Sequence, residues 1–66
     1  MIADKKKVEI QMARLRINRA ALADRAELTE ASVKNVLYGR NVRPATIGKL
    51  AYALGVDVTE IVKEEA

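Results

Sequence analysis

The stretch from 18 to 37 constrains the fold most, because its apolar residues recur at helical spacing with one interruption, at Glu27 and Leu28. A single break in the middle of such a stretch predicts two short helices joined by a tight turn. Thr29 can cap the second helix through its hydroxyl, and Glu30 in the first turn suits the positive end of that helix. The rest of the chain must therefore supply the apolar surface that holds this pair of helices.

The chain is long enough for only a modest core. At 66 residues it is predicted to form one domain, 1–66, and a chain of this size buries only about 60% of its unfolded surface. It has no cysteine for a disulfide or a thiolate zinc site, and no histidine, the commonest general base. An enzyme is therefore the weakest alternative, and we expect neither a cofactor nor a metal.

The sequence predicts neither a membrane span nor an export signal. No apolar run approaches the roughly 18 to 20 residues of a membrane span, and residues 1–7 lack the apolar region of a signal peptide. We therefore expect a soluble, cytoplasmic protein with no membrane partner. Residues 1–4 and 64–66 are predicted to be loose ends.

Positive charge is concentrated before the C-terminal end. Residues 1–50 hold eleven Lys and Arg against five Asp and Glu, a net +6, whereas residues 51–66 hold one Lys against four acids, a net −3. A basic body is typical of proteins that bind polyanions, because cations at phosphates release counterions, but solvated charged surfaces are also common. For the lysine run at 5–7, with Arg14 and Arg16, we favour a solvated surface, with a phosphate-binding flank as the alternative.

Periodicity, caps and breakers predict an all-α fold of five helices, with no strand pair and no internal repeat. Asn18 and Asp57 suit N-caps, and Pro44 suits a first helical turn. Gly39 and Gly55 suit helix ends, where a left-handed residue often follows the last turn. The five predicted helices span about 5–16, 19–26, 30–38, 44–54 and 57–62.

The second helix of the central pair, about Glu30 to Tyr38, is predicted to turn one face inward and one outward. Val33, Val36 and Leu37 share the inward face at steps of about 100° per residue. A helix with a small, hydrogen-bonding outer face fits the major groove of B-form DNA, where Asn can bond adenine, Lys guanine, Ser either base, and Ala a thymine methyl. The alternative is an ordinary polar exterior. The outward residues are Ala31, Ser32, Lys34, Asn35 and Tyr38.

A short basic loop follows this helix and favours the nucleic-acid interpretation. Its side chains, with the tyrosine at the helix end, can hold phosphates on either side of a groove. RNA is a less favoured partner, because the chain has two tyrosines and no other aromatic residue to stack on unpaired bases. The residues expected at phosphates here are Tyr38, Arg40, Asn41 and Arg43.

Over about Val8 to Val62 the sequence resembles the lambda-repressor-like, Xre-type (Cro/repressor) helix-turn-helix DNA-binding family. The family pattern begins with an apolar residue followed by Ala, and after a turn it has an apolar residue followed by a Ser or Thr cap. It continues with two apolar positions in the recognition helix, then a Gly-basic-Pro loop, and closes with an Ala-Leu-Gly-Val ending. The matching residues are Leu22, Ala23, Leu28, Thr29, Val33, Val36, Gly39 to Pro44 and Ala53 to Val56. The resemblance implies a five-helix lambda-repressor-like domain with its helix-turn-helix motif at about 19–38.

The resemblance also implies which residues meet DNA. Glu30 has two alternatives, because it can act only on the helix dipole or accept from a cytosine amino group. The implied phosphate contacts are Arg19, Tyr38, Arg40 and Arg43. The residues implied to face bases or the groove wall are Thr29, Glu30, Ala31, Ser32, Lys34 and Asn35.

Two positions depart from the family pattern. Glu27 stands where the turn usually has Gly, so a left-handed backbone there carries strain, and the alternative is a wider turn that shifts the second helix. Leu37 stands where many members have a glutamate, which suggests a tighter apolar join to helix 44–54. We expect the Leu37 departure to leave the function unchanged, whereas a wider turn at Glu27 would shift the individual DNA contacts.

The favoured function is a sequence-specific double-stranded DNA-binding transcriptional regulator, resembling small phage, plasmid or mobile-element repressors that block polymerase. Most such proteins bind as dimers, so we expect a short inverted repeat with recognition helices about 34 to 36 Å apart. Val58, Ile61 and Val62 are candidates for a homodimer contact, although two of them are expected to pack onto helix 44–54. The alternative is an antitoxin-like or bridging module whose main surface binds another protein.

Overall fold

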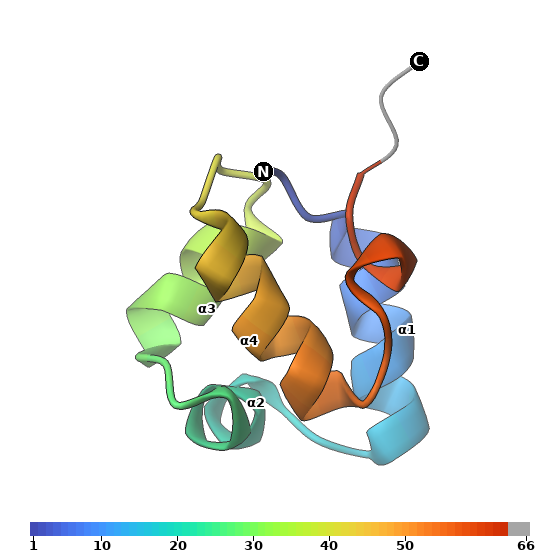
Figure 1. Ribbon diagram of the computed structural model, residues 1–66. Coiled ribbons are helices and arrows are strands. Elements are labelled where there is room, and N and C mark those ends of the chain that lie inside the picture. The colour runs from blue at the N-terminus through green and yellow to red at the C-terminus, as the bar shows by residue number, and fades with distance from the viewer. Residues whose placement is uncertain (64–66) are drawn as a thin grey trace.

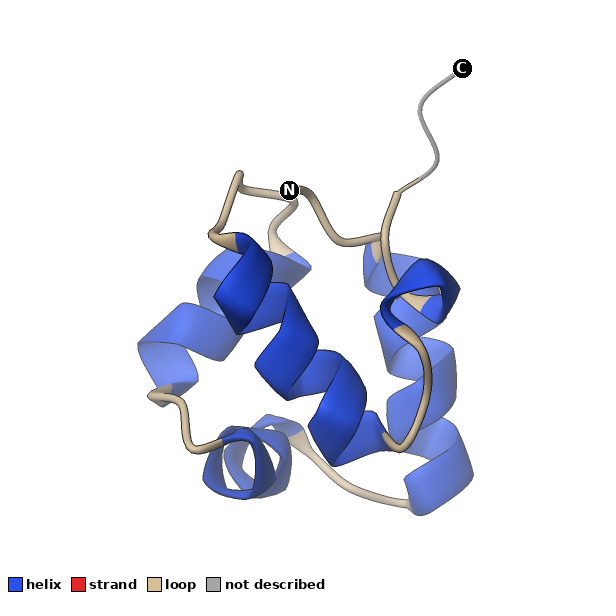
Figure 2. Ribbon diagram, viewed as in Figure 1, coloured by secondary structure: helices blue, strands red, loops and turns tan. Residues whose placement is uncertain are grey.

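The computed structural model describes residues 1–63, in which four α-helices and one short 3-10 turn surround a common apolar core (Figure 1). The described residues contain no strand, and an isolated antiparallel bridge pairs Ala3 with Val62 (Figure 2). No helix in this range is long and apolar enough to cross a membrane. The elements are α1 (Lys5–Leu15), α2 (Arg19–Ala26), α3 (Glu30–Leu37), α4 (Pro44–Leu54) and η1 (Val58–Glu60).

The core is built around α4, which runs through the middle of the molecule (Figure 1). Its apolar stripe is buried, as the sequence predicts, and α2 and η1 pack against it. Leu37 also lies in the core, where a glutamate would be an uncompensated charge. The largest fully buried side chains are Val8, Leu22, Val33, Val36, Ile47, Leu50, Leu54 and Ile61.

The prediction of five helices is wrong, because the fifth element is the three-residue turn η1. The Asp57 cap is confirmed: its carboxylate accepts the Thr59 N–H at 3.0 Å. Beyond the turn, however, the Ile61 carbonyl accepts the Asp4 N–H at 2.8 Å, and the Lys63 N–H donates to the Ile2 carbonyl at 2.9 Å. These bonds to a distant segment use backbone carbonyl and N–H groups that a longer helix would need for its own hydrogen bonds.

The prediction that residues 1–4 form a loose end is also wrong. Ala3 is only 2% exposed, within the core. The Met1 carbonyl accepts the Val42 N–H at 2.8 Å, so this segment joins the chain after α3 to the C-terminal segment at 61–63. Figure 1 shows the N-terminus beside the loop between α3 and α4. The predicted loose end at 64–66 lies outside the described residues.

All four helices end in the same way. A left-handed residue follows each helix, directly after α1, α2 and α4 and one residue later, beyond Tyr38, after α3. The residue after it donates its N–H to the carbonyl five residues back, which is the Schellman arrangement. After α1, α2 and α4 the successor is apolar and packs against the core: Ile17, Leu28 and Val56. After α3 the successor is the exposed Arg40, so the chain turns outward there. The left-handed residues are Arg16, Glu27, Gly39 and Gly55.

The helix ends follow the predictions closely. α1 and α3 end one residue early, at Leu15 and Leu37, because the next residue already lies in the terminating turn. Glu27 takes the left-handed conformation at φ 56° and ψ 41°, so the turn between α2 and α3 keeps the glycine-like geometry. The alternative of a widened turn is therefore wrong.

Candidate nucleic-acid interface

Two side-chain caps position α2 and α3. The Asn18 side chain accepts the Ala21 N–H at 2.9 Å, and the Thr29 hydroxyl oxygen accepts the Ser32 N–H at 3.1 Å. The Thr29 hydroxyl also donates to the Ser32 hydroxyl oxygen at 3.0 Å. Ser32 therefore keeps its own hydroxyl hydrogen for an outside acceptor, whereas Thr29 already uses its hydrogen within the turn.

The outer side of α3 is open to solvent. Its residues Ala31, Lys34, Asn35 and Tyr38 are exposed and Ser32 is half-buried; we call these five residues the reading face. Opposite them, Val33, Val36 and Leu37 are buried in the core. Within residues 1–63 the Asn35 side chain makes no hydrogen bond, so both groups of its amide remain for a partner.

Tyr38 is held beside Lys34 at the end of α3. The Lys34 ammonium lies 5.6 Å from the centre of the Tyr38 ring, within the range of a cation–π contact. The Tyr38 side chain is 59% exposed. The pair therefore presents a cation and a phenol hydroxyl together on the reading face.

Shallow hollows lie on both sides of α3, and each contains a predicted phosphate contact. One joins the start of α2 to the start of α3 and is lined by Arg19, Glu30, Ala31 and Lys34. The other joins α3 to the following loop and to α4, and is lined by Ser32, Asn35, Asn41, Val42, Arg43 and Thr46. The structure thus brings base-contact and phosphate-contact candidates into one surface, with α3 between cations.

The basic loop, residues 39–43, leaves α3 through Gly39, whose φ is 75°. Arg40 and Arg43 are exposed, and Arg43 precedes the first turn of α4 without capping it through its side chain. Asn41 has a second role, because its side-chain oxygen accepts from the Met1 amino group at 2.6 Å. Only its NH₂ group remains for a phosphate.

For Arg14 and Thr46 the structure differs from the interpretation of the sequence. Arg14 donates to the Leu54 carbonyl at 2.6 Å and to Gln11 at 2.8 Å, so it holds α1 to the end of α4 and is more than a solvated cation. Thr46 was not predicted, yet it lines the same hollow as Asn35. The available signal was its place two residues after Pro44, in the first turn of the helix that follows the basic loop.

The geometry agrees with the comparison of the sequence with known families. A family model described as a Cro/C1-type HTH DNA-binding domain matches residues 7–66. The chain belongs to the Cro/C1-type helix-turn-helix family. Comparisons with curated proteins and with solved structures found no match.

Membership of the Cro/C1-type family confirms the resemblance seen in the sequence and makes the chain a DNA-binding regulator. In this Cro/C1-type chain the motif comprises α2, the turn at 27–29 and α3. No group of three or more His, Cys, Asp or Glu in the described range is arranged to hold a metal ion. The chemistry that the Cro/C1-type surface offers is hydrogen bonding and positive charge.

Proposed function

We propose that residues 1–66 form one sequence-specific double-stranded DNA-binding domain, a small cytoplasmic repressor that places α3 in the major groove. The observation that carries this proposal is the position of the reading face between cations on opposite sides. Arg19 lies with Lys34 on one side, and Arg43 lies with Asn35 on the other. A helix that enters a groove between two phosphate backbones needs this order of cation, polar face and cation.

The reading face supplies the base contacts in this proposal. Asn35 bonds adenine through its free amide, and Lys34 donates to guanine. Ser32 donates its hydroxyl hydrogen, and Ala31 lies against a thymine methyl. Thr29 and Glu30 stand at the leading end of α3, where Thr29 serves mainly as the cap.

The phosphate contacts come from both sides of α3. Arg19 begins α2, and its exposed guanidinium is placed for one backbone. The other backbone meets the end of α3 and the basic loop, where the cations are not held by ion pairs within residues 1–63. These contacts set register and affinity and carry no sequence information. The residues on this second side are Arg40, Asn41 and Arg43, and Tyr38 offers a further phosphate contact at the end of α3 beside Lys34.

Binding at an operator represses by blocking polymerase, and a homodimer would read an inverted repeat with half-sites about 34 to 36 Å apart. The three candidates for a dimer contact differ in burial. Ile61 is fully buried, and Val62 is partly buried against the core. Val58, at 36% exposed, is the most exposed of the three and the best candidate for contact with a second copy.

One observation favours a protein partner as a second candidate function. Tyr52 on α4 is 88% exposed, and with Gly48 and Lys49 it lines a shallow hollow between α2 and α4, which we call the α2–α4 hollow. Exposed aromatic residues are enriched where proteins bind other proteins. An antitoxin-like or bridging module would use this surface, and substitutions on the reading face would then leave its function intact.

The test begins with selection of bound sequences from a random DNA pool, which also shows whether the site is symmetric. Fluorescence anisotropy at several salt concentrations then compares the wild type with two variants. Asn35→Ala should cost about 1 to 3 kcal/mol and relax specificity at one position. Arg40→Ala should weaken all sequences and lower the magnitude of the salt slope by about 1.

Lys49→Gln is the matched control, because Lys49 is exposed and lines the α2–α4 hollow instead of the proposed interface. We expect it to leave both specificity and salt slope close to the wild-type values. Absence of salt-dependent DNA binding by the wild-type protein would overturn the proposed function.

A further inference from the structure

The basic loop has few backbone bonds of its own. Its first two residues, Gly39 and Arg40, complete the end of α3 through N–H bonds of 3.1 and 3.2 Å to carbonyls of that helix. Its last residue, Arg43, begins α4, because its carbonyl accepts an N–H of the first turn at 3.0 Å. Within residues 1–63 the middle of the loop, Asn41 and Val42, makes no backbone bond to either helix.

Met1 holds the middle of the loop instead. The Val42 N–H donates to the Met1 carbonyl at 2.8 Å, and the Val42 carbonyl accepts from the Met1 amino group at 2.7 Å. The same amino group donates to the Asn41 side-chain oxygen at 2.6 Å. Three bonds from one residue therefore hold a stretch that the neighbouring helices leave unbonded.

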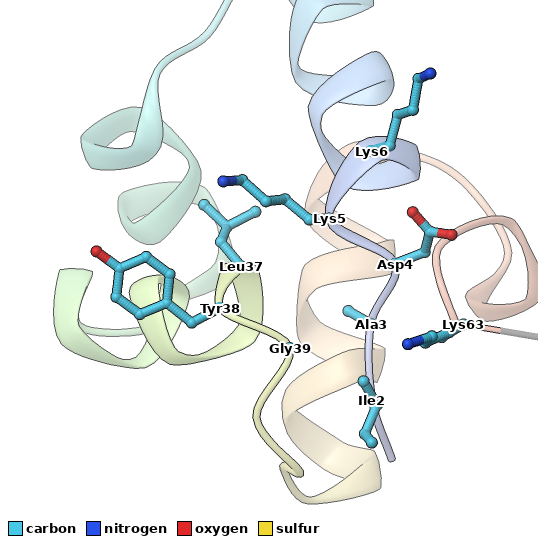
Figure 3. Close-up of a pocket in the computed structure, with 9 residues that line it drawn as sticks. All are labelled: Ile2, Ala3, Asp4, Lys5, Lys6, Leu37, Tyr38, Gly39 and Lys63. Carbon is cyan, nitrogen blue, oxygen red and sulfur yellow. The ribbon is translucent and has the colours of Figure 1, made fainter.

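Residues 1–4, which we call the strap, are themselves anchored in the core. Ala3 is only 2% exposed, and two backbone bonds of 2.8 and 2.9 Å join the strap to the C-terminal segment at 61–63. Figure 3 shows the strap passing between the end of α3, at Gly39, and Lys63 of the C-terminal segment. The strap thus ties the basic loop to the body of the domain.

The bonds from the strap fall between proposed phosphate contacts. Val42 is flanked by Asn41 and Arg43, and all three line the hollow that also contains Asn35 of the reading face. The Val42 side chain is partly buried against the core, so side chain and backbone are both held. The place from which Asn41 and Arg43 reach out is therefore set where the strap holds Val42.

A loop that is held in advance binds at a lower cost. Each residue whose backbone becomes ordered only on binding weakens affinity, because lost conformational freedom opposes association. In the free protein the strap already orders the middle of the loop. The phosphate contacts of Asn41 and Arg43 then form without that loss.

We propose that the strap positions the basic loop for DNA, with Met1 as the positioning residue that keeps the loop in the conformation that meets the phosphate backbone. This proposal rests on the proposed function, because it assigns a role within the same DNA complex. Met1 contacts the loop and no DNA atom. By thermodynamic linkage, DNA binding stabilises the docked strap by the same factor by which the docked strap strengthens DNA binding.

The test removes Met1 alone. A chain of residues 2–66, made by chemical synthesis, loses the three Met1 bonds but keeps the backbone bonds between the strap and 61–63. Its net charge is unchanged, because Ile2 then carries the amino group. Met1→Ala, made in the same way, is the matched control, because it keeps the carbonyl and the amino group of residue 1.

Anisotropy titrations with the selected DNA give the affinity and its salt slope. We expect the shortened chain to bind about five- to thirtyfold more weakly, the equivalent of ordering the backbone of one further residue on binding. Its salt slope and base preference should equal those of the wild type, because every cation of the interface remains. Met1→Ala should bind like the wild type. A smaller slope for the shortened chain would mean that the Met1 amino group itself meets a phosphate, and would overturn the positioning role.

Ala3→Gln is a second variant, which keeps the full chain and its net charge. A larger, polar side chain at this buried position should release the strap from the core and reproduce the loss of affinity. Ala13→Gln, on the exposed side of α1, is its control and should bind like the wild type. A circular dichroism melt shows the temperature at which each variant is folded, and the shortened chain decides the matter if Ala3→Gln does not fold.

Amide hydrogen exchange separates positioning from a merely structural role. The Val42 N–H should exchange faster in the shortened chain than in Met1→Ala, and DNA should slow its exchange in the wild type. A strap that only stabilised the fold would lower Tm when lost, yet leave the affinity of the folded protein unchanged.

The outcomes for the strap and for the proposed function can be told apart. If the wild type binds DNA and the folded shortened chain binds it equally well, the strap proposal is wrong and the proposed function stands. If the wild type binds no DNA, the proposed function fails and the strap proposal fails with it.

Discussion

Replacement of Glu27 by Gly should stabilise the protein, because Glu27 has a left-handed backbone that glycine adopts without strain. Its φ of 56° and ψ of 41° lie in the region that costs an ordinary L-residue roughly 1 to 2 kcal/mol. Glycine also adds freedom to the unfolded chain, which offsets about 0.4 to 1 kcal/mol of that gain. The exposed Glu27 side chain makes no hydrogen bond within residues 1–63, so nothing else is lost. The net expectation is a gain of about 0.5 to 1 kcal/mol.

Thermal unfolding followed by circular dichroism measures this gain. For a domain of this size, 1 kcal/mol corresponds to about 4 to 8 °C in Tm, so Glu27→Gly should raise Tm by about 2 to 8 °C. Urea unfolding should show a higher midpoint with an unchanged m-value. DNA affinity should change little, because the turn between α2 and α3 already has the backbone geometry that glycine adopts, and the angle between the two helices stays the same.

Glu27→Ala is the matched control. It removes the same carboxylate but keeps a Cβ, and so keeps the backbone strain. The difference between the Gly and Ala variants therefore isolates the effect of the backbone. A Gly variant no more stable than the Ala variant would show that the strain at the turn does not exceed the entropic loss from glycine, and would refute this reasoning.

Two further predictions concern the C-terminal segment. Ile61→Ala should cost about 2 to 5 kcal/mol in urea unfolding, because Ile61 is fully buried, while the exposed neighbour change Val58→Ala should cost much less; equal costs would mean that the segment is not docked. Hydrogen bonds from the Thr59 backbone N–H and hydroxyl lower the pKa of Asp57. Its carboxylate therefore contributes stability that is fully present above the unfolded pKa of about 3.9, and this stability is lost as the pH falls through the lower folded pKa. The stability difference between wild type and Asp57→Asn should therefore stay constant from pH 7 to about pH 5 and shrink below about pH 4, whereas a difference that is constant in acid would contradict this account.

The local features of this fold could be predicted from the sequence. Asn18, Thr29 and Asp57 cap elements where the sequence places them, and Gly39 and Gly55 follow helix ends as expected. The inward and outward faces of α3 also agree with its periodicity. These features depend on interactions within one or two helical turns, so a short window of sequence contains the information that determines them.

The tertiary structure decided the features that join distant parts of the chain. Helical periodicity gave no sign that residues 1–4 would pair with Val42 and with 61–63, that η1 would stop after one turn, or that Asn41 would hold the N-terminus. It also left open whether Glu27 would keep a glycine-like turn. The pairing of residues 1–4, the early end of η1 and the Asn41 bond depend on hydrogen bonds and burial between segments remote in sequence, and such contacts have no periodic pattern. For that reason residues 1–4 look like a loose end in the sequence, and only the fold sets Met1 beside the basic loop.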